Sequence, residues 1–305
     1  SSIYLQYYIF SDDETGREIA SILKEKARAG VTVKVIYDHV GSFSAHNRFF
    51  RDMRRAGVDV HPFFRVTFPQ LANRINWRNH RKIVVIDGRV GYIGGMNIAS
   101  RYLRGQEGRV WRDTHFRVTG EIVKFLLASF ALDWSFMNQS LENLPPLPEV
   151  TVPSTVLGMQ LVISGPTDPW HSLSLCFLKA ISSARKCVYI QTPFLPTEAL
   201  LEALQTAALA QVDVRVMIPR VSDSKVIRYA SFSYVTQLLN AGIKVYLYEP
   251  GMLHSKNMII DDDLVTSGST NFDFRSFENN FESNLFIYSR RANESMRSIF
   301  FADMK

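Results

Sequence analysis

Two short stretches of the chain share one combination of histidine, lysine, aspartate and asparagine. Each reads H-x-K-x4-D and is followed, after a glycine-containing stretch, by an asparagine at the same distance from the histidine. The first copy consists of His80, Lys82, Asp87 and Asn97, and the second of His254, Lys256, Asp261 and Asn271. A lone H-x-K is common by chance, whereas two copies with matched aspartates and asparagines indicate a functional motif present twice.

These residue types fit the exchange of a phosphodiester. Histidine titrates near neutral pH and can act as nucleophile, base or acid. The non-bridging oxygens gain negative charge during displacement, and two lysines with two asparagines would stabilise that charge. One histidine would form a phospho-histidine, while the other would protonate the leaving alkoxide and then deprotonate the incoming alcohol or water. Ser269 would add a hydroxyl near the phosphate in the second copy only, since Gly95 stands at the matching place in the first.

Strand geometry separates the motif aspartates from the histidines and lysines. The residues after each H-x-K are apolar and β-prone, so each motif is predicted to lie on a strand, where residues two apart project from the same face. Asp87 and Asp261 have the opposite parity, because each follows its histidine by an odd number of positions. Asp87 precedes Gly88 at a hairpin signal, and Asp261 opens a run of three aspartates typical of a turn. The name of the H-x-K-x4-D motif includes both aspartates and so counts them among the catalytic residues, but we predict a structural role for them.

Two other carboxylates are candidates for orienting the catalytic histidines. A catalytic histidine needs a partner on its second ring nitrogen, which fixes the tautomer and the ring orientation. Asp113 and Glu282 stand at equivalent places, each at the entrance of an otherwise apolar strand after its motif. The alternative is a surface ion pair, but the matched positions favour the orienting role.

Neither a metal nor a cofactor is expected at this site. The lysines supply the positive charge that a phosphodiester requires. No cluster of histidine and aspartate has the spacing of metal ligands, and the run of three aspartates from Asp261 has plain turn composition.

The elements around the two motifs follow one repeated order. Apolar strands alternate with amphipathic helices, which predicts an α/β fold with helices on both faces of a mixed sheet in each half. In the first half we predict strands at 3–9, 31–37 and 58–64 and helices at 13–29 and 47–56; in the second, strands at 188–191, 212–218 and 243–248 and helices at 197–210 and 231–241. Prolines between the halves indicate a linker at 141–157, with the first half at 1–140 and the second at 158–305. One continuous domain with a long surface loop is the alternative.

Composition limits the partners. The chain has 305 residues, a net charge of +6 and a pI near 9.3, which favours anionic partners, either phospholipid headgroups or nucleic acid.

Cys176 and Cys187 are too few for a disulfide framework and are expected to be buried free thiols. The longest apolar stretch, residues 122–137, is interrupted by charges and is predicted to be a buried helix rather than a membrane span. Since the chain begins at Ser1 and not at Met, we expect that a segment preceded it.

At these motifs the sequence resembles the phospholipase D superfamily, and around them it resembles the bacterial cardiolipin synthases. The resemblance extends along nearly the whole chain and includes NHRKIVVIDGRVGYIGGMNIASRY, WRDTHFRVTG, YIQTPFLP, LHSKNMIIDDD and STNFDFRSFENNFESN. It implies a duplicated phospholipase D-like α/β sandwich with pseudo-twofold symmetry and with His80 as the nucleophile. It also implies transfer of a phosphatidyl group from phosphatidylglycerol to a second lipid alcohol, with release of glycerol.

The same resemblance implies an anionic phospholipid substrate and a place at the bacterial cytoplasmic (inner) membrane, peripheral or anchored by a segment missing from this chain. A phospholipase D that hydrolyses phospholipid to phosphatidic acid is the nearest alternative. It has the same motifs and differs only in that water, and not a lipid alcohol, reaches the site as acceptor. A nuclease of the superfamily and a non-catalytic lipid-binding relative are further alternatives. The sequence that flanks the motifs argues against the nuclease, and the two intact motifs argue against the non-catalytic relative.

Overall fold

The computed structural model describes residues 1–65, 76–140, 157–194, 197–221 and 225–305. These residues form two compact units, Ser1–Leu103 with His115–Val156 and Arg104–Thr114 with Leu157–Lys305. The predicted linker at 141–157 lies outside the described residues except for Leu157, so the predicted boundaries stay a prediction. One feature was not predicted: the segment Arg104–Thr114, which precedes the end of the first half, packs with the second unit.

The first unit is built on a six-stranded sheet in the order β3-β2-β1-β5-β6-β8. The strands are β1 Ser2–Tyr7, β2 Thr32–Asp38, β3 Asp59–Phe63, β5 Ile83–Ile86, β6 Val90–Gly94 and β8 His115–Thr119, and a short strand β4 covers Arg78–Asn79. β1, β2 and β3 are parallel, and β5 runs antiparallel to β1. The helices are α1 Glu14–Arg28, α2 Asn47–Arg55, α3 Arg101–Arg104 and α4 Ile122–Phe136.

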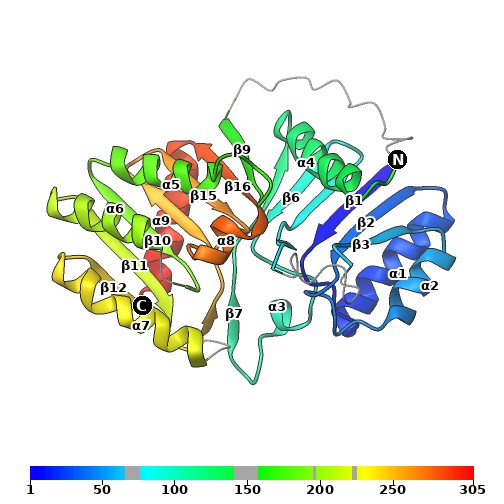
Figure 1. Ribbon diagram of the computed structural model, residues 1–305, viewed down its shortest axis with the longest axis horizontal. Coiled ribbons are helices and arrows are strands. Elements are labelled where there is room, and N and C mark those ends of the chain that lie inside the picture. The colour runs from blue at the N-terminus through cyan, green and yellow to red at the C-terminus, as the bar shows by residue number, and fades with distance from the viewer. Residues whose placement is uncertain (66–75, 141–156, 195–196, 222–224) are drawn as a thin grey trace. The chain divides into compact units, whose positions relative to one another are not determined.

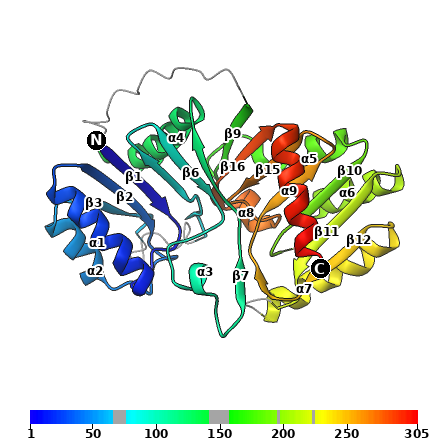
Figure 2. The same cartoon turned by 180° about the vertical axis from the view of Figure 1, so that it is seen from behind.

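Alternation along β1 shows how helices cover both faces of this sheet. Leu5 points into the core that α1 and α2 complete with residues such as Leu23 and Phe50. Tyr4 points to the other face, where its ring lies 5.3 Å from that of Phe130 on α4. α1 and α2 lie side by side on their face of the sheet, and α4 lies on the opposite face (Figure 1, Figure 2).

The second unit repeats this order. Its strands follow the sequence β12-β11-β10-β14-β15-β16, and β9 pairs with β16. The strands are β9 Gly158–Ser164, β10 Cys187–Gln191, β11 Asp213–Pro219, β12 Lys244–Tyr248, β14 Asn257–Ile260, β15 Leu264–Gly268 and β16 Asn280–Tyr288, and a parallel pair joins β7 Val110–Arg112 to β13 Gly251–Leu253. The helices are α5 Ser172–Ser183, α6 Glu198–Leu209, α7 Lys225–Asn240, α8 Phe274–Glu278 and α9 Arg290–Asp303.

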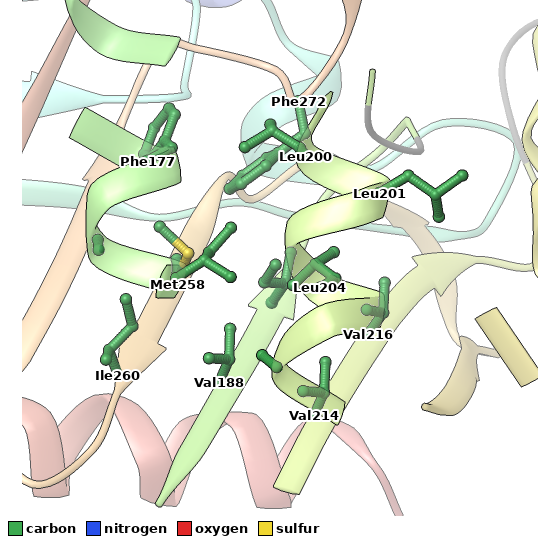
Figure 3. Close-up of a cluster of buried hydrophobic side chains, with 14 of the residues drawn as sticks. Phe177, Val188, Leu200, Leu201, Leu204, Val214, Val216, Met258, Ile260 and Phe272 are labelled. Atoms are coloured by element: carbon green, nitrogen blue, oxygen red, sulfur yellow. The ribbon is translucent and has the colours of Figure 1, made fainter. Parts of the chain in front are cut away.

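The duplication is visible in the strand pairing. β10 is parallel to β11 and antiparallel to β14, as β1 is parallel to β2 and antiparallel to β5. By position in this order α6 corresponds to α1, α7 to α2 and α9 to α4. The core of the second unit lies between its sheet and helices α5 and α6, with Val188, Leu204 and Met258 among its buried side chains (Figure 3). The predicted α/β class with a mixed sheet in each half is therefore confirmed.

Two expectations about burial need correction. Helix α4 was expected to be buried, but Phe125 and Leu132 are each 59% exposed, so one face of the helix is apolar and open. The inner face of α4 alone accounts for its packing on the sheet, with Phe130 and Trp134 fully covered. Cys187 is a buried free thiol as predicted, whereas Cys176 is only half-buried. Within the described ranges, no helix combines the length and apolar character needed to cross a membrane.

Candidate active site

Asp133 on α4 binds side chains of the first motif segment from one side of the sheet. Its carboxylate accepts hydrogen bonds from Asn79 Nδ2 at 3.0 Å and Arg81 Nη1 at 2.5 Å, and it also contacts Gln6 Nε2. All of these groups are buried. The odd-numbered residues of this stretch, Asn79 and Arg81, therefore point toward α4.

His80 and Lys82 point to the opposite side, as strand alternation predicted. The His80 ring lies 4.9 Å from the ring of Tyr8 in an edge arrangement, and Lys82 Nζ lies 5.5 Å from the centre of the same ring. Lys82 Nζ also donates to the carbonyl oxygen of His80 at 2.5 Å. Both residues precede β5 instead of lying within it, because the pairing of β1 with β5 ends at Gln6 and Ile83. The alternation nevertheless continues through this extended segment.

Asn97 completes the first half-site, by which we mean His80, Lys82 and Asn97. Its Oδ1 accepts from the backbone amide of Ile9 at 3.1 Å, and its Nδ2 donates to the Tyr102 hydroxyl at 2.6 Å. Asn97 is buried. One of its two amide hydrogens remains for another acceptor, so a phosphate contact is compatible with this geometry.

The second half-site consists of His254, Lys256 and Asn271, and the carboxylate of Asp113 contacts its histidine. His254 Nδ1 lies 2.6 Å from Asp113 Oδ2. Lys256 Nζ lies 3.0 Å from the same ring nitrogen and also donates to the carbonyl oxygen of His254. Because Asp113 is a carboxylate, Nδ1 donates to it, and Lys256 Nζ cannot donate to a nitrogen that already carries hydrogen. In its neutral form His254 therefore carries the lone pair on Nε2, and in its charged form it carries a second proton there.

The charge state of Asp113 follows from its surroundings. Burial by itself would raise the pKa of this carboxyl group. The positive charges of His254 and Lys256, together with the hydrogen bonds from His254 and the Thr114 amide, outweigh burial and hold the pKa of Asp113 below its ordinary value. Asp113 is therefore ionised at neutral pH and is suited to stabilise an imidazolium at His254.

The segment that carries Asp113 is bound to the second motif at several points. Strand β7 pairs with β13, and the amide of His254 donates to the carbonyl oxygen of Arg112 at 2.7 Å. Thr114 Oγ1 accepts from Asn257 Nδ2 at 2.9 Å. Asp113 follows the first motif in sequence but contacts the histidine of the second, which sequence order could not reveal.

Ser269 and Glu282 form a buried polar cluster in the second unit. Ser269 Oγ donates to Glu282 Oε2 at 2.5 Å and accepts from the amide of Ser283 at 2.9 Å. Asn280 Nδ2 donates to Glu282 Oε1 at 3.0 Å. Ser269 thus positions Glu282 in this structure, and its contact with a phosphate stays a prediction, as does the histidine-orienting role of Glu282. The Oδ1 atom of Asn271 is buried with no hydrogen-bond partner in the described part of the chain.

The motif aspartates bind backbone amides. Asp261 accepts from the amides of Arg185, Lys186 and Cys187, at 3.0, 2.7 and 3.1 Å, and so fixes the start of β10. Asp87 accepts from the amide of Ser2 at 2.6 Å and fixes the start of β1. The expected backbone hydrogen bonding is present, although the amides lie at or just before the start of a neighbouring strand and not in the turn itself.

Both aspartates have left-handed backbone conformations, with φ of 55° at Asp87 and 47° at Asp261. Aspartate and asparagine tolerate this region better than most other residues. The turns therefore favour Asp for its backbone as well as for its carboxylate. Whether either residue takes part in the reaction stays a prediction.

The described residues contain no group of three or more histidine, cysteine, aspartate or glutamate side chains placed to hold a metal ion. The charged groups of the half-sites are lysines and histidines instead. Each half-site therefore has its own cations with which to contact an anionic group.

Comparison with known proteins identifies the family of this arrangement. A family profile described as "Cardiolipin synthase, PLD-like domain" matches residues 1–134 and 177–304. A cardiolipin synthase of Geobacillus kaustophilus is 43% identical over 290 residues, covering 94% of this chain and 58% of that protein. The major cardiolipin synthase of Bacillus subtilis is 40% identical over 306 residues, covering 99% of this chain and 64% of that protein. The chain thus spans about three fifths of the length of these curated relatives.

Solved structures share the fold at low sequence identity. A phosphatidylserine synthase of Haemophilus influenzae superposes with a TM-score of 0.72 at 16% identity, covering 99% of this chain and 81% of that chain. A polyphosphate kinase of Porphyromonas gingivalis gives a TM-score of 0.65 at 14% identity, covering 98% of this chain and 42% of that chain. These similarities concern the fold alone.

Proposed function

This chain belongs to the family of cardiolipin synthase, phospholipase D-like domains, and we propose that it transfers a phosphatidyl group from one phosphatidylglycerol to a hydroxyl of a second, releasing glycerol. The observation that carries the proposal is the Asp113–His254 contact of 2.6 Å, in which Nδ1 donates to the carboxylate and Nε2 is left as the ring nitrogen that can exchange a proton. The first half-site offers a second histidine and lysine of the same motif. Two such histidines suit a reaction with two displacement steps.

In the first step, Nε2 of one histidine attacks phosphorus. A phosphorus–nitrogen bond forms, the bond from phosphorus to the glycerol oxygen breaks, and the other histidine protonates that oxygen. We assign the attack to His80, as the family resemblance implies, and the proton transfer to His254. The Asp113 carboxylate supports the latter role, because it stabilises the imidazolium that donates the proton.

In the second step, the same acid–base histidine removes the proton from a hydroxyl of the acceptor lipid. The acceptor oxygen attacks phosphorus, and the phosphorus–nitrogen bond breaks. Lys82 and Lys256 stabilise the charge on the non-bridging oxygens in both steps, with Asn97, Asn271 and Ser269 as hydrogen-bond donors. The product contains two phosphates joined by one glycerol, and free glycerol leaves.

The proposed partner is an anionic phospholipid at the surface of a bacterial cytoplasmic membrane. The relatives named above are bacterial proteins, and the chain carries a net charge of +6. Positive charge favours binding to anionic lipid. Attachment to that membrane is part of the proposal.

Product analysis tests the reaction. Purified protein is incubated with phosphatidylglycerol vesicles, and lipids and glycerol are identified by mass spectrometry. We expect equal amounts of cardiolipin and glycerol, both abolished in His80→Asn and His254→Asn. Phosphatidic acid with glycerol would show a hydrolase instead. Degradation of DNA with no lipid product would show a nuclease, and a lack of any product would favour a lipid-binding relative.

A further inference from the structure

The positive charge of the chain is concentrated on two helices of the first unit. Helices α1 and α2 carry eight basic and four acidic residues, a net charge of 8 − 4 = +4, against +6 for the whole chain. The basic residues are Arg17, Lys24, Lys26, Arg28, Arg48, Arg51, Arg54 and Arg55. All of them are exposed except Lys24, which is half-buried. We refer to α1 and α2 together as the basic layer.

The second unit provides an internal control. Helices α6 and α7, which occupy the corresponding positions, carry two basic and two acidic residues, a net charge of 2 − 2 = 0. The fold needs helices at these positions, but it does not need them to be basic. The charge of α1 and α2 is therefore not a requirement of the fold.

A groove in the basic layer brings cations of both helices together. It has a volume of about 400 Å³, and its walls include Arg17, Lys24, His46 and Arg48. Two acids also line it, and both have partners: Asp12 lies 2.7 Å from Arg17, and Asp52 lies 3.9 Å from Arg48. Among the described residues, Lys24 has no ion-pair partner. The groove thus has positive charge available for an anion the size of a phosphate group.

Apolar side chains are exposed beside these cations. Phe43, three residues before His46, is 83% exposed, the largest value among the exposed large hydrophobic residues of the described chain. Val40 of the same loop and Ile22 of α1 are exposed as well. Exposed aromatic and aliphatic groups among Lys and Arg fit the interface of an anionic bilayer, where the rings enter the headgroup region and the cations contact phosphates. The phosphates of a duplex would bind the cations and give the apolar side chains no partner.

We propose that the basic layer is a docking surface for an anionic bilayer, with Phe43 inserted at the interface and the groove holding a lipid phosphate. None of the residues that line the groove belongs to the first half-site. The inference rests on the proposed function for the choice of a phospholipid bilayer as partner, but binding is measured without turnover. A failure of the proposed reaction is therefore distinguishable from a failure of this inference.

The test compares two triple variants of the chain. One carries Arg48→Ala, Arg51→Ala and Arg55→Ala on α2, and the matched control carries Arg290→Ala, Arg291→Ala and Lys305→Ala, so that both lose three exposed positive charges. Co-sedimentation measures binding to vesicles of phosphatidylglycerol in phosphatidylcholine and to vesicles of phosphatidylcholine alone. Thermal unfolding of both variants verifies that they fold.

We expect the α2 variant to lose roughly 100-fold in binding to the anionic vesicles, because each cation near such a surface contributes a factor of about five. The control should lose far less. Equal losses in the two variants would show that only total charge matters and would overturn the proposal. Wild-type binding by the α2 variant would overturn it too.

Two further arms separate the alternatives. Phe43→Ser should bind anionic vesicles about tenfold more weakly, the scale for losing partial burial of a phenyl ring, and unchanged binding would overturn the inserted anchor. Duplex DNA is offered to the α2 variant at the same salt concentration. Loss of DNA binding with vesicle binding intact would identify the basic layer as a nucleic acid surface and overturn the proposal.

Discussion

Replacing the motif aspartates separates a structural role from a catalytic one. Asp261 accepts three backbone hydrogen bonds and Asp87 accepts one. At about 1 kcal/mol for each hydrogen bond, the bonds lost in Asp261→Ala are worth about 3 kcal/mol and those in Asp87→Ala about 1 kcal/mol. Both residues have positive φ, so the added strain of alanine is similar in the two variants and cancels when they are compared. Asp261→Ala should therefore be less stable than Asp87→Ala by about 2 kcal/mol.

Urea unfolding measures the two free energies of unfolding, and single-turnover kinetics measures the chemistry in the folded fraction. We expect both folded variants to retain turnover near that of the wild type. His80→Asn and His254→Asn serve as controls that should lose turnover while keeping stability. A stable Asp87 variant as inactive as His80→Asn would refute the parity argument, and equal stability of the two alanine variants would refute the hydrogen-bond count.

Three other outcomes follow from the site. Lys82→Ala and Lys256→Ala should each lower turnover by roughly a hundredfold or more, the scale for one positioned donor to developing charge, and near-wild-type turnover in either would show that the phosphate lies elsewhere. Asp113→Asn should lower turnover by about a hundredfold or more, because the amide no longer stabilises an imidazolium at His254; activity at the wild-type level would contradict the orienting role. The stability that Asp113 contributes should depend on pH. Because the pKa of Asp113 is lowered in the folded state, this contribution is complete above about pH 4 and is lost as pH falls through the lowered pKa. The difference in unfolding free energy between the wild type and Asp113→Asn should therefore become smaller in acid. Exhaustive chelation should leave turnover unchanged, whereas loss of activity restored by a trace divalent ion would contradict the proposed chemistry.

The sequence predicted the parts of the site that depend on local periodicity. Alternation along an extended chain places His80 with Lys82 and opposite Arg81, and the contacts of Tyr8 and Asp133 follow that pattern. The repeated order of strands and helices predicted two α/β units. The resemblance to cardiolipin synthases, which rests on the sequence that flanks the motifs, is confirmed at the level of the family.

Features that depend on long-range pairing were not predictable in this way. Periodicity does not predict which segments pair when they are far apart in the sequence. The pairing of β7 with β13 and the contact of Asp113 with the histidine of the second motif were therefore not predicted. The amides bound by Asp261 likewise lie at and just before the start of β10, more than 70 residues away in the sequence. For α4, a helix apolar on all sides is typically buried. Only the structure shows that Phe125 and Leu132 remain uncovered.

The central claim is that a histidine carries the phosphatidyl group between donor and acceptor lipid. Phosphatidylglycerol labelled in its phosphate is mixed with the protein and quenched in the first turnover under conditions that preserve phospho-histidine, and the labelled peptide is then mapped. We predict label on the peptide that contains His80. The label should be absent in His80→Asn. In His254→Asn, assayed after prolonged incubation, it should be retained or increased. Label on His254 alone would contradict the assignment of the nucleophile, and cardiolipin formed with no label on either histidine would contradict the two-step reaction itself.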